Sequence, residues 1–103
     1  MTVKEFMAKS GCNITSRCYE YLPMALEIAS EAPDMSLSVI CEKVANEREV
    51  THKAVSKALD RLVKGSYQNM DADIKKAVFN NREKVTTAKY IRGVSNAIRN
   101  GII

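Results

Sequence analysis

Apolar residues recur three and four positions apart along nearly the whole chain, and this spacing constrains its fold more than any other feature. The spacing places apolar side chains on one face of an α-helix, which turns once about every 3.6 residues. Strict alternation and turn-bounded β-branched runs, which indicate strands, are nearly absent. The sequence therefore predicts an all-α fold.

Helix caps and stop signals divide this pattern into six predicted helices. The first five cover about Thr2–Ser10, Ser16–Glu31, Leu37–Asn46, His52–Gln68 and Asp71–Phe79, and the last runs from a cap at Thr86 or Thr87 to Asn100-Gly101. Asp34 or Ser36 caps the third helix, and Thr51 caps the fourth. Because Pro23 removes a backbone donor, the second helix could instead start near residue 21. We expect a single domain over residues 1–103, since this length is near the commonest domain size.

The composition excludes several classes of protein. No apolar run approaches the roughly 20 residues that span a bilayer, and the amino end lacks the features of a secretion signal, so we expect a cytoplasmic protein that does not act at a membrane. Three cysteines are an odd number for a disulfide framework. Cys12, Cys18, Cys41 and His52 contain no close pair spaced like a zinc knuckle, so we expect buried thiols, no metal site and no cofactor.

The net charge of +4 is divided unevenly along the chain. Residues 1–52 carry five basic and eight acidic side chains, a net charge of −3, whereas residues 53–103 carry eleven basic and four acidic ones, a net charge of +7. Within one compact domain this asymmetry predicts a basic face, which is typical of nucleic-acid binders. Lysines scattered over solvated helix exteriors are the alternative explanation.

The helices predicted over Leu37–Asn46 and His52–Gln68 are joined by a short polar turn, which is the arrangement of a helix-turn-helix. The second helix of such a pair fits the major groove of DNA, and residues in its first two turns reach the base edges. The base-reading candidates are His52, Lys53, Ser56 and Lys57. Phosphates attract cations and the free N–H groups of a helix start, so the phosphate-contact candidates are Thr51, Arg61, Lys84, Thr86, Thr87 and Lys89.

Each of these features also has a simpler explanation. Any helical bundle contains apolar helices joined by short turns with lysine outside, and Thr86 or Thr87 is an ordinary cap if its loop faces away from the fourth helix. An enzyme is not expected, because the only histidine has no acid or nucleophile partner evident in the sequence, and no phosphate-binding glycine loop is present. We therefore expect neither catalysis nor a small-molecule substrate.

Several short motifs, in their order and spacing, resemble a known family. They are Tyr19-Glu20-Tyr21-Leu22 with Ala25-Leu26, Ile40 to Ala45, Thr51 to Val55 with Ala58-Leu59, Lys84-Val85-Thr86-Thr87, Tyr90-Ile91 and Asn96-Ala97-Ile98-Arg99. Over nearly its whole length the chain resembles the C-terminal DNA-binding effector domain of the sporulation response regulators, the stage 0 sporulation protein A family.

The resemblance implies a six-helix bundle containing a helix-turn-helix, with the fourth helix, about residues 52–68 here, in the major groove, and domains paired as homodimers on tandem DNA sites. The family's base-reading positions fall on Ala54, Ser56 and Lys57, of which only Lys57 keeps a charge. Because the guanidinium fork of arginine is missing, the docking mode carries over and the target sequence stays open. The family's phosphorylated receiver domain has no counterpart in these residues, so the chain is either a stand-alone binder, which Met1 at its start favours, or a fragment of a longer protein.

These observations predict a transcription regulator that binds double-stranded DNA. The alternative is a helical protein-interaction module that binds a partner protein and has lost sequence-specific DNA readout.

Overall fold

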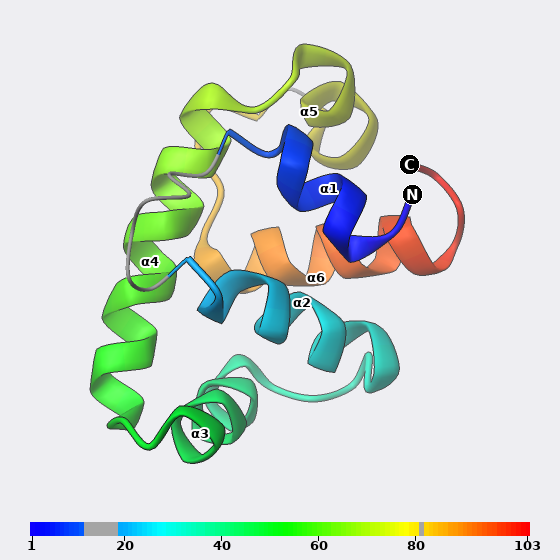
Figure 1. Ribbon diagram of the computed structural model, residues 1–103. Coiled ribbons are helices and arrows are strands. Elements are labelled where there is room, and N and C mark those ends of the chain that lie inside the picture. The colour runs from blue at the N-terminus through cyan, green and yellow to red at the C-terminus, as the bar shows by residue number, and fades with distance from the viewer. Residues whose placement is uncertain (12–18, 81) are drawn as a thin grey trace.

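The computed structural model describes residues 1–11, 19–80 and 82–103, and within these ranges the chain forms six helices and no strand (Figure 1). The helices are α1 (Val3–Lys9), α2 (Tyr21–Glu31), α3 (Leu37–Arg48), α4 (His52–Asn69), α5 (Ala72–Phe79) and α6 (Thr87–Arg99). The prediction of an all-α fold with six helices is confirmed.

The second helix begins later than the predicted range of Ser16–Glu31. α2 starts at Tyr21, after a turn at residues 19 and 20, whereas residues 16–18 lie outside the described ranges. Pro23 fits this start, because in the first turn of a helix a missing N–H costs no intrahelical hydrogen bond. The structure therefore supports the start near residue 21.

The third helix ends later than predicted. α3 continues past Asn46 to Arg48, where the left-handed backbone of Glu49 (φ 55°) ends it and the Glu49 N–H bonds to the carbonyl of Ala45. A residue with left-handed backbone angles commonly closes a helix at this position, and glycine adopts these angles most easily. Glutamate gives no such stop signal, which explains the difference.

Side-chain caps begin five of the described helices. The capping residues, each accepting a hydrogen bond from a backbone N–H of the first turn, are Thr2, Ser36, Thr51, Asp71 and Thr86. Of the caps considered for α3 and α6, the structure thus uses Ser36 and Thr86. At α1 the cap is reciprocal, because the Thr2 N–H donates to the Glu5 carboxylate at 3.2 Å, and this bond lowers the pKa of Glu5.

Aromatic rings from four helices meet in the core. Phe79 of α5 stacks on Tyr90 of α6 with ring centroids 5.8 Å apart, and Tyr67 of α4 meets Phe79 edge-on at 5.3 Å. Phe6 of α1 meets Tyr90 edge-on at 6.3 Å. These ring contacts join the short helices α1 and α5 to the rest of the core.

A buried polar network crosses the same region. The Ser66 hydroxyl donates to the backbone carbonyl of Ser10 at 2.7 Å, so the hydrogen bond of 2.6 Å between Ser66 and the Tyr90 hydroxyl takes its proton from Tyr90. All three residues are buried, and a buried hydroxyl without a partner would be costly. The network therefore fixes the end of α1 against α4 and α6.

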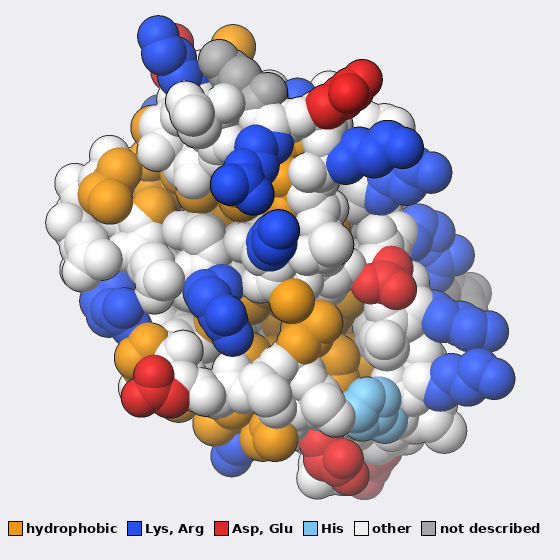
Figure 2. Space-filling view, turned by 180° about the vertical axis from the view of Figure 1, so that it is seen from behind, with side chains coloured by type: hydrophobic (Ala, Val, Ile, Leu, Met, Phe, Trp, Pro, Cys, Tyr) orange, Lys and Arg blue, Asp and Glu red, His pale blue; other side chains and the backbone are white. Residues whose placement is uncertain are grey.

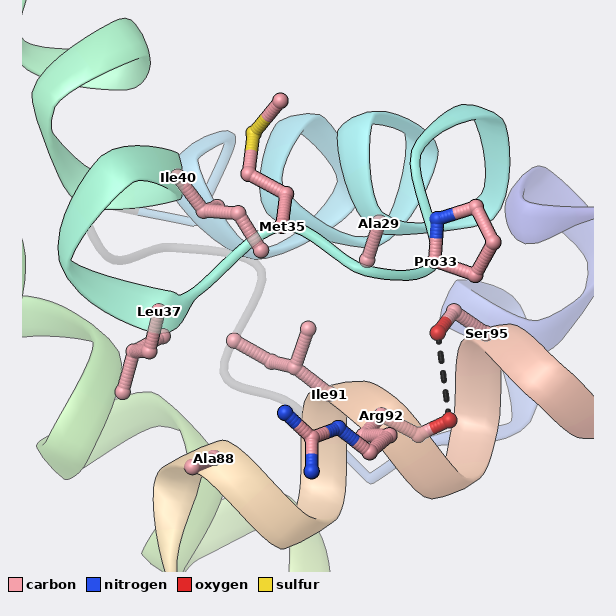
Figure 3. A pocket seen from close by; sticks show the side chains of 9 residues that line it. All are labelled: Ala29, Pro33, Met35, Leu37, Ile40, Ala88, Ile91, Arg92 and Ser95. Carbon is pink, nitrogen blue, oxygen red and sulfur yellow. Dashed lines mark hydrogen bonds between the residues drawn. The ribbon is translucent and has the colours of Figure 1, made fainter.

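α6 packs against α2, and residues of the segment that joins α2 to α3 line a small cavity together with α6. Figure 3 shows Ile91 pointing from α6 into the space between these elements. The cavity left there measures only about 20 Å³, which is room for about one water molecule. This contact therefore positions α6, and the cavity is too small for an organic ligand.

The two chain ends meet. The Met1 ammonium group donates to the backbone carbonyl of Ile103 at 2.8 Å, and Figure 1 shows both ends on the side of the molecule away from α4. Within the described ranges, every helix is too short or too polar to cross a lipid bilayer.

Candidate nucleic-acid interface

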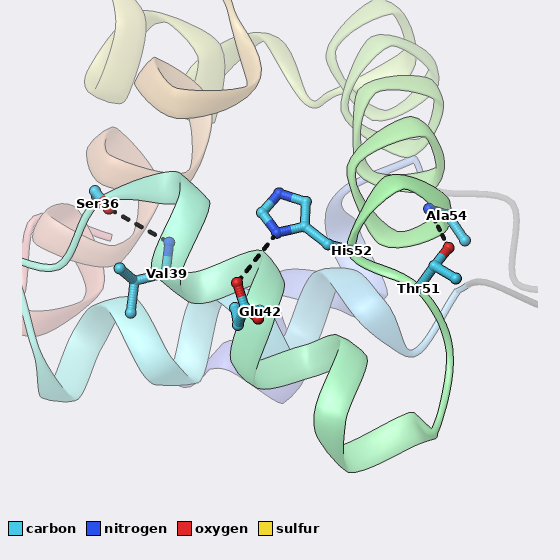
Figure 4. Close-up of polar contacts among 6 residues, drawn as sticks. All are labelled: Ser36, Val39, Glu42, Thr51, His52 and Ala54. Carbon is cyan, nitrogen blue, oxygen red and sulfur yellow. Dashed lines mark hydrogen bonds and ion pairs between the residues drawn. The ribbon is translucent and has the colours of Figure 1, made fainter.

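α3 and α4 form a helix-turn-helix unit whose turn is residues 49–51. The N–H of Val50 donates to the carbonyl of Ala45 at 3.0 Å, beside the bond from Glu49 that closes α3. Thr51 then caps α4 by accepting a hydrogen bond from the N–H of Ala54 at 3.1 Å (Figure 4). Backbone bonds and a side-chain cap thus hold this turn, and they fix the direction in which α4 leaves it.

His52, a base-reading candidate, lies against α3 (Figure 4). Its Nδ1 is 3.6 Å from a carboxylate oxygen of Glu42, and its side chain is 41% exposed. The contact is an ion pair when the imidazole is protonated, and it ties the first turn of α4 to α3. His52 is therefore partly engaged within the unit.

α4 has a buried stripe and a basic outer face. The buried residues are Val55, Ala58, Leu59, Leu62, Val63, Ser66 and Tyr67. Four exposed cations, which we call the basic row, follow the opposite face: Lys53, Lys57, Arg61 and Lys64. Figure 2 shows a row of Lys and Arg side chains along the right-hand edge of the molecule, which α4 forms. Spacings of three and four keep these cations on one helix face.

The four base-reading candidates differ in their surroundings. Lys53 and Lys57 are exposed within the basic row, whereas Ser56 is half-buried on its flank and His52 contacts Glu42. The amino-terminal half of α4 therefore presents mainly lysine to an approaching molecule.

The segment at residues 83–87 lies beside α4. The Thr87 hydroxyl donates a hydrogen bond to the Asp60 carboxylate on α4. Between the segment and the helix runs a groove of about 540 Å³, the α4 groove, and its lining includes the cations Lys64 and Lys84, the carboxylates Asp60 and Glu83, and the threonines Thr86 and Thr87. The loop before α6 thus faces the fourth helix, as a role in phosphate contacts requires.

Tyr67 anchors the chain just before this segment. Its ring is buried, and its hydroxyl donates to the backbone carbonyl of Arg82. Burial raises the pKa of the Tyr67 phenol, against the lowering effect of the Arg82 charge, so the group remains a neutral donor. This bond holds the chain before the α4 groove in place.

Five of the six phosphate-contact candidates lie on or beside α4: Thr51, Arg61, Lys84, Thr86 and Thr87. Lys89 lies apart from them, in a hollow between α5 and α6. The candidates named from the sequence omitted Lys64, which completes the basic row and lines the α4 groove. The signal was its spacing, because Lys64 follows Arg61 by three positions and Lys57 by seven.

Among the described residues, no three His, Cys, Asp or Glu side chains form a cluster that could hold a metal ion. Cys12 and Cys18 fall outside those residues. Cys41 is buried, and desolvation together with the nearby Asp60 charge raises the pKa of its thiol. A buried protonated thiol is a poor nucleophile and a poor metal ligand, so Cys41 contributes to packing.

The sequence matches none of the known protein families and none of the characterised proteins with which we compared it. The structure establishes an all-helical arrangement of the described residues, with a radius of gyration of 12.5 Å. Function is therefore inferred from the geometry and charge of α4 and its surroundings.

Proposed function

We propose that this chain binds double-stranded DNA, with the amino-terminal half of α4 in the major groove, and acts as a cytoplasmic transcription regulator without catalysis or a cofactor. The basic row carries the proposal, because it places four exposed cations on one face of a helix that follows a short turn. An α-helix fits the major groove, and cations on its outer face donate to base edges or neutralise phosphates.

The segment beside α4 supports the same docking mode. When a helix enters the major groove, the phosphate backbones pass along its two sides. Lys84 and Thr87 lie beside α4 in the α4 groove, where such a backbone would run. The first turn of α6 lies at the same place, and the N–H groups of a first helical turn favour an anion, although the Thr86 cap takes that of Lys89.

The resemblance to the effector domains of the sporulation response regulators supports the proposal further, because their fourth helix of six enters the major groove. Where that family reads bases with two arginines and a glutamate, this chain has Ala54, Lys57 and Ser56. Lysine donates from one point and lacks a planar fork. We therefore propose the same docking, in pairs on tandem sites, with a different target sequence and fewer base contacts.

The decisive test is selection of bound fragments from a random duplex pool, followed by affinity measurements at several salt concentrations. The basic row and Lys84 together provide five cations, and each neutralised phosphate contributes about −0.9 to the slope of log affinity against log salt. We expect a slope of roughly −4 to −5. A complete lack of duplex binding at about 50 mM salt would contradict the proposal.

Single substitutions show how much each residue contributes to the slope of log affinity against log salt. Lys84→Ala should make the slope shallower by about one and leave the selected sequence unchanged, because a phosphate contact positions the domain without reading bases. Lys4→Ala is the matched control, since Lys4 is exposed at the start of α1. Lys4→Ala should change neither the salt slope nor the selected sequence.

Exposed apolar side chains favour a second candidate function, the protein-interaction module. Val39 on α3 is 45% exposed and Val50 in the turn is 37% exposed, and both belong to the helix-turn-helix unit. Apolar groups at the surface commonly mark protein contacts when they form a patch. This candidate predicts no enriched DNA sequence and no salt-dependent duplex binding, so the same selection distinguishes the two functions.

A further inference from the structure

A second basic surface lies between α5 and α6, on helices that do not carry the basic row. It is a hollow of about 310 Å³, the α5–α6 hollow. Its buried and half-buried lining is Val78, Phe79, Val85 and Gly93, and its exposed cations are Arg82, Lys89 and Arg92. On the face shown in Figure 2, apolar surface is visible between separate Lys and Arg side chains.

Gly93 gives the hollow its shape. A Cβ atom at this position would lie 3.0 Å from the Phe79 ring and 3.3 Å from a methyl group of Val78. The missing side chain therefore lets α5 approach α6 closely and leaves ring and methyl surface at the bottom of the hollow.

Among the described residues, no acidic side chain forms an ion pair with any of the three cations. Within the described ranges, the ion pairs are Arg48 with Glu20 and His52 with Glu42, and neither involves the hollow. The eight residues that line the hollow include no Asp or Glu. The electrostatic potential over the hollow is therefore positive, and a carboxylate that enters meets no fixed repulsive charge from its walls.

We propose that the α5–α6 hollow binds an acidic segment of a partner protein, in which an apolar side chain is flanked by carboxylates. The apolar side chain leaves water for the surface of Val78 and Phe79, as the anchor residue of a small interface does. The carboxylates pair with the three cations, and the two arginines offer the planar fork that binds a carboxylate with two hydrogen bonds. This site stands whether or not α4 binds DNA.

The shape of the hollow favours a peptide over a nucleic acid. A duplex presents its phosphates on the outside of a convex surface and has no projecting apolar group there. It would leave the apolar floor of the hollow unfilled. A leucine-sized side chain fits such a recess while its acidic neighbours reach the rim.

The test is a titration of the isotope-labelled protein, followed through its amide chemical shifts. The probe is a peptide of about twelve residues, with blocked ends and one leucine flanked by glutamates on one helical face. One comparison peptide has serine in place of leucine, and another has glutamine in place of each glutamate. We expect shift changes at the amides of Val78, Phe79 and Gly93, and at least about tenfold weaker binding of both comparison peptides.

A charge-reversed variant locates the interaction. Arg92→Glu should weaken binding of the leucine peptide by about tenfold or more, because Arg92 lines the hollow. Arg99→Glu is the matched control, since Arg99 is also exposed on α6 but lies outside the hollow. The affinity of this variant for the leucine peptide should stay within about twofold of that of the unaltered protein. A thermal melt of each variant checks that it is folded.

Three results would overturn the proposal. Equal binding of the leucine and serine peptides would mean that charge alone attracts them. Equal losses in Arg92→Glu and Arg99→Glu would mean that the hollow is not the place of binding. Unchanged amides in the hollow, together with loss of duplex affinity in Arg92→Glu, would assign this surface to DNA.

Discussion

The hydroxyl of Thr87 donates a hydrogen bond to the carboxylate of Asp60, and this bond ties the start of α6 to the exposed side of α4. Asp60 is the only acidic residue of α4, and it lies between Lys57 and Arg61 in the sequence. The bond holds the segment beside the α4 groove, whereas the charge opposes the attraction of the neighbouring cations for phosphate. Substitution can separate these two effects.

Asp60→Asn removes the charge and keeps an acceptor for Thr87. We expect the affinity for duplex DNA to rise by about threefold to tenfold at low salt, because one repulsive charge leaves the basic row. Asp60→Ala, which also removes the bond, should gain less. Fluorescence anisotropy with a labelled duplex measures both. Weaker binding of Asp60→Asn would instead indicate that the carboxylate accepts a hydrogen bond from a cytosine amino group.

Lys57→Ala should weaken specific DNA binding by about 1 to 3 kcal/mol and flatten the preference at about one or two base positions. The Lys57 side chain is exposed in the basic row, as a base contact requires. Selection from a random pool with the variant measures the change in preference. Lys43→Ala, an exposed lysine of α3 outside the basic row, is the control. An unaltered selected sequence in Lys57→Ala would remove Lys57 from the base-reading residues.

Leu59→Ala should lower the free energy of unfolding by about 2 to 5 kcal/mol, because it deletes a large side chain from the core. Leu59 is fully buried, with 0% of its surface exposed. Val39→Ala, at a position that is 45% exposed, should change stability by less than about 0.5 kcal/mol. Urea unfolding followed by circular dichroism gives both values. Similar midpoints for the two variants would contradict the observed packing of α4.

Two helix-interior glycines should respond to alanine in opposite directions. A Cβ at Gly65 in α4 meets nothing within 4 Å, so Gly65→Ala should stabilise the fold by about 1 kcal/mol through helix propensity. A Cβ at Gly93 meets Phe79 at 3.0 Å, and the Phe79 ring is held by Tyr67 and Tyr90. Overpacking there costs about 1 to 3 kcal/mol and exceeds the gain in propensity, so Gly93→Ala should be destabilising. Thermal melts of both variants test the contrast.

Periodicity and capping predicted the helices because both depend on residues close in sequence. The Ser36 and Thr86 caps involve an N–H three positions further on, and Leu59 lies on the stripe that helical spacing defines. The sequence does not decide the first residue of α2, and the reason is physical. Pro23 fits either a kink within a long helix or the first turn of a shorter one, and local sequence does not distinguish these cases.

The candidate site was predictable only in part, because contacts between distant residues shape it. Thr87 meets Asp60 across 27 positions, and nothing in the neighbouring sequence marks them as a pair. Lys84 and Lys89 are close in sequence, and the sequence predicts phosphate contacts for both, yet they line different recesses. Which side of α6 a cation occupies depends on how α5 and α4 pack against that helix.

The contact between Met1 and Ile103 makes the backbone almost a closed ring. A linker of a few residues could join these ends, and the chain could be reopened at an exposed connection such as Pro33-Asp34. The resulting circular permutant would keep the helices and the basic row while changing which helix is synthesised first. A protein fused at either terminus would be carried on the side away from α4, so the basic row would remain open to a long, rod-shaped molecule.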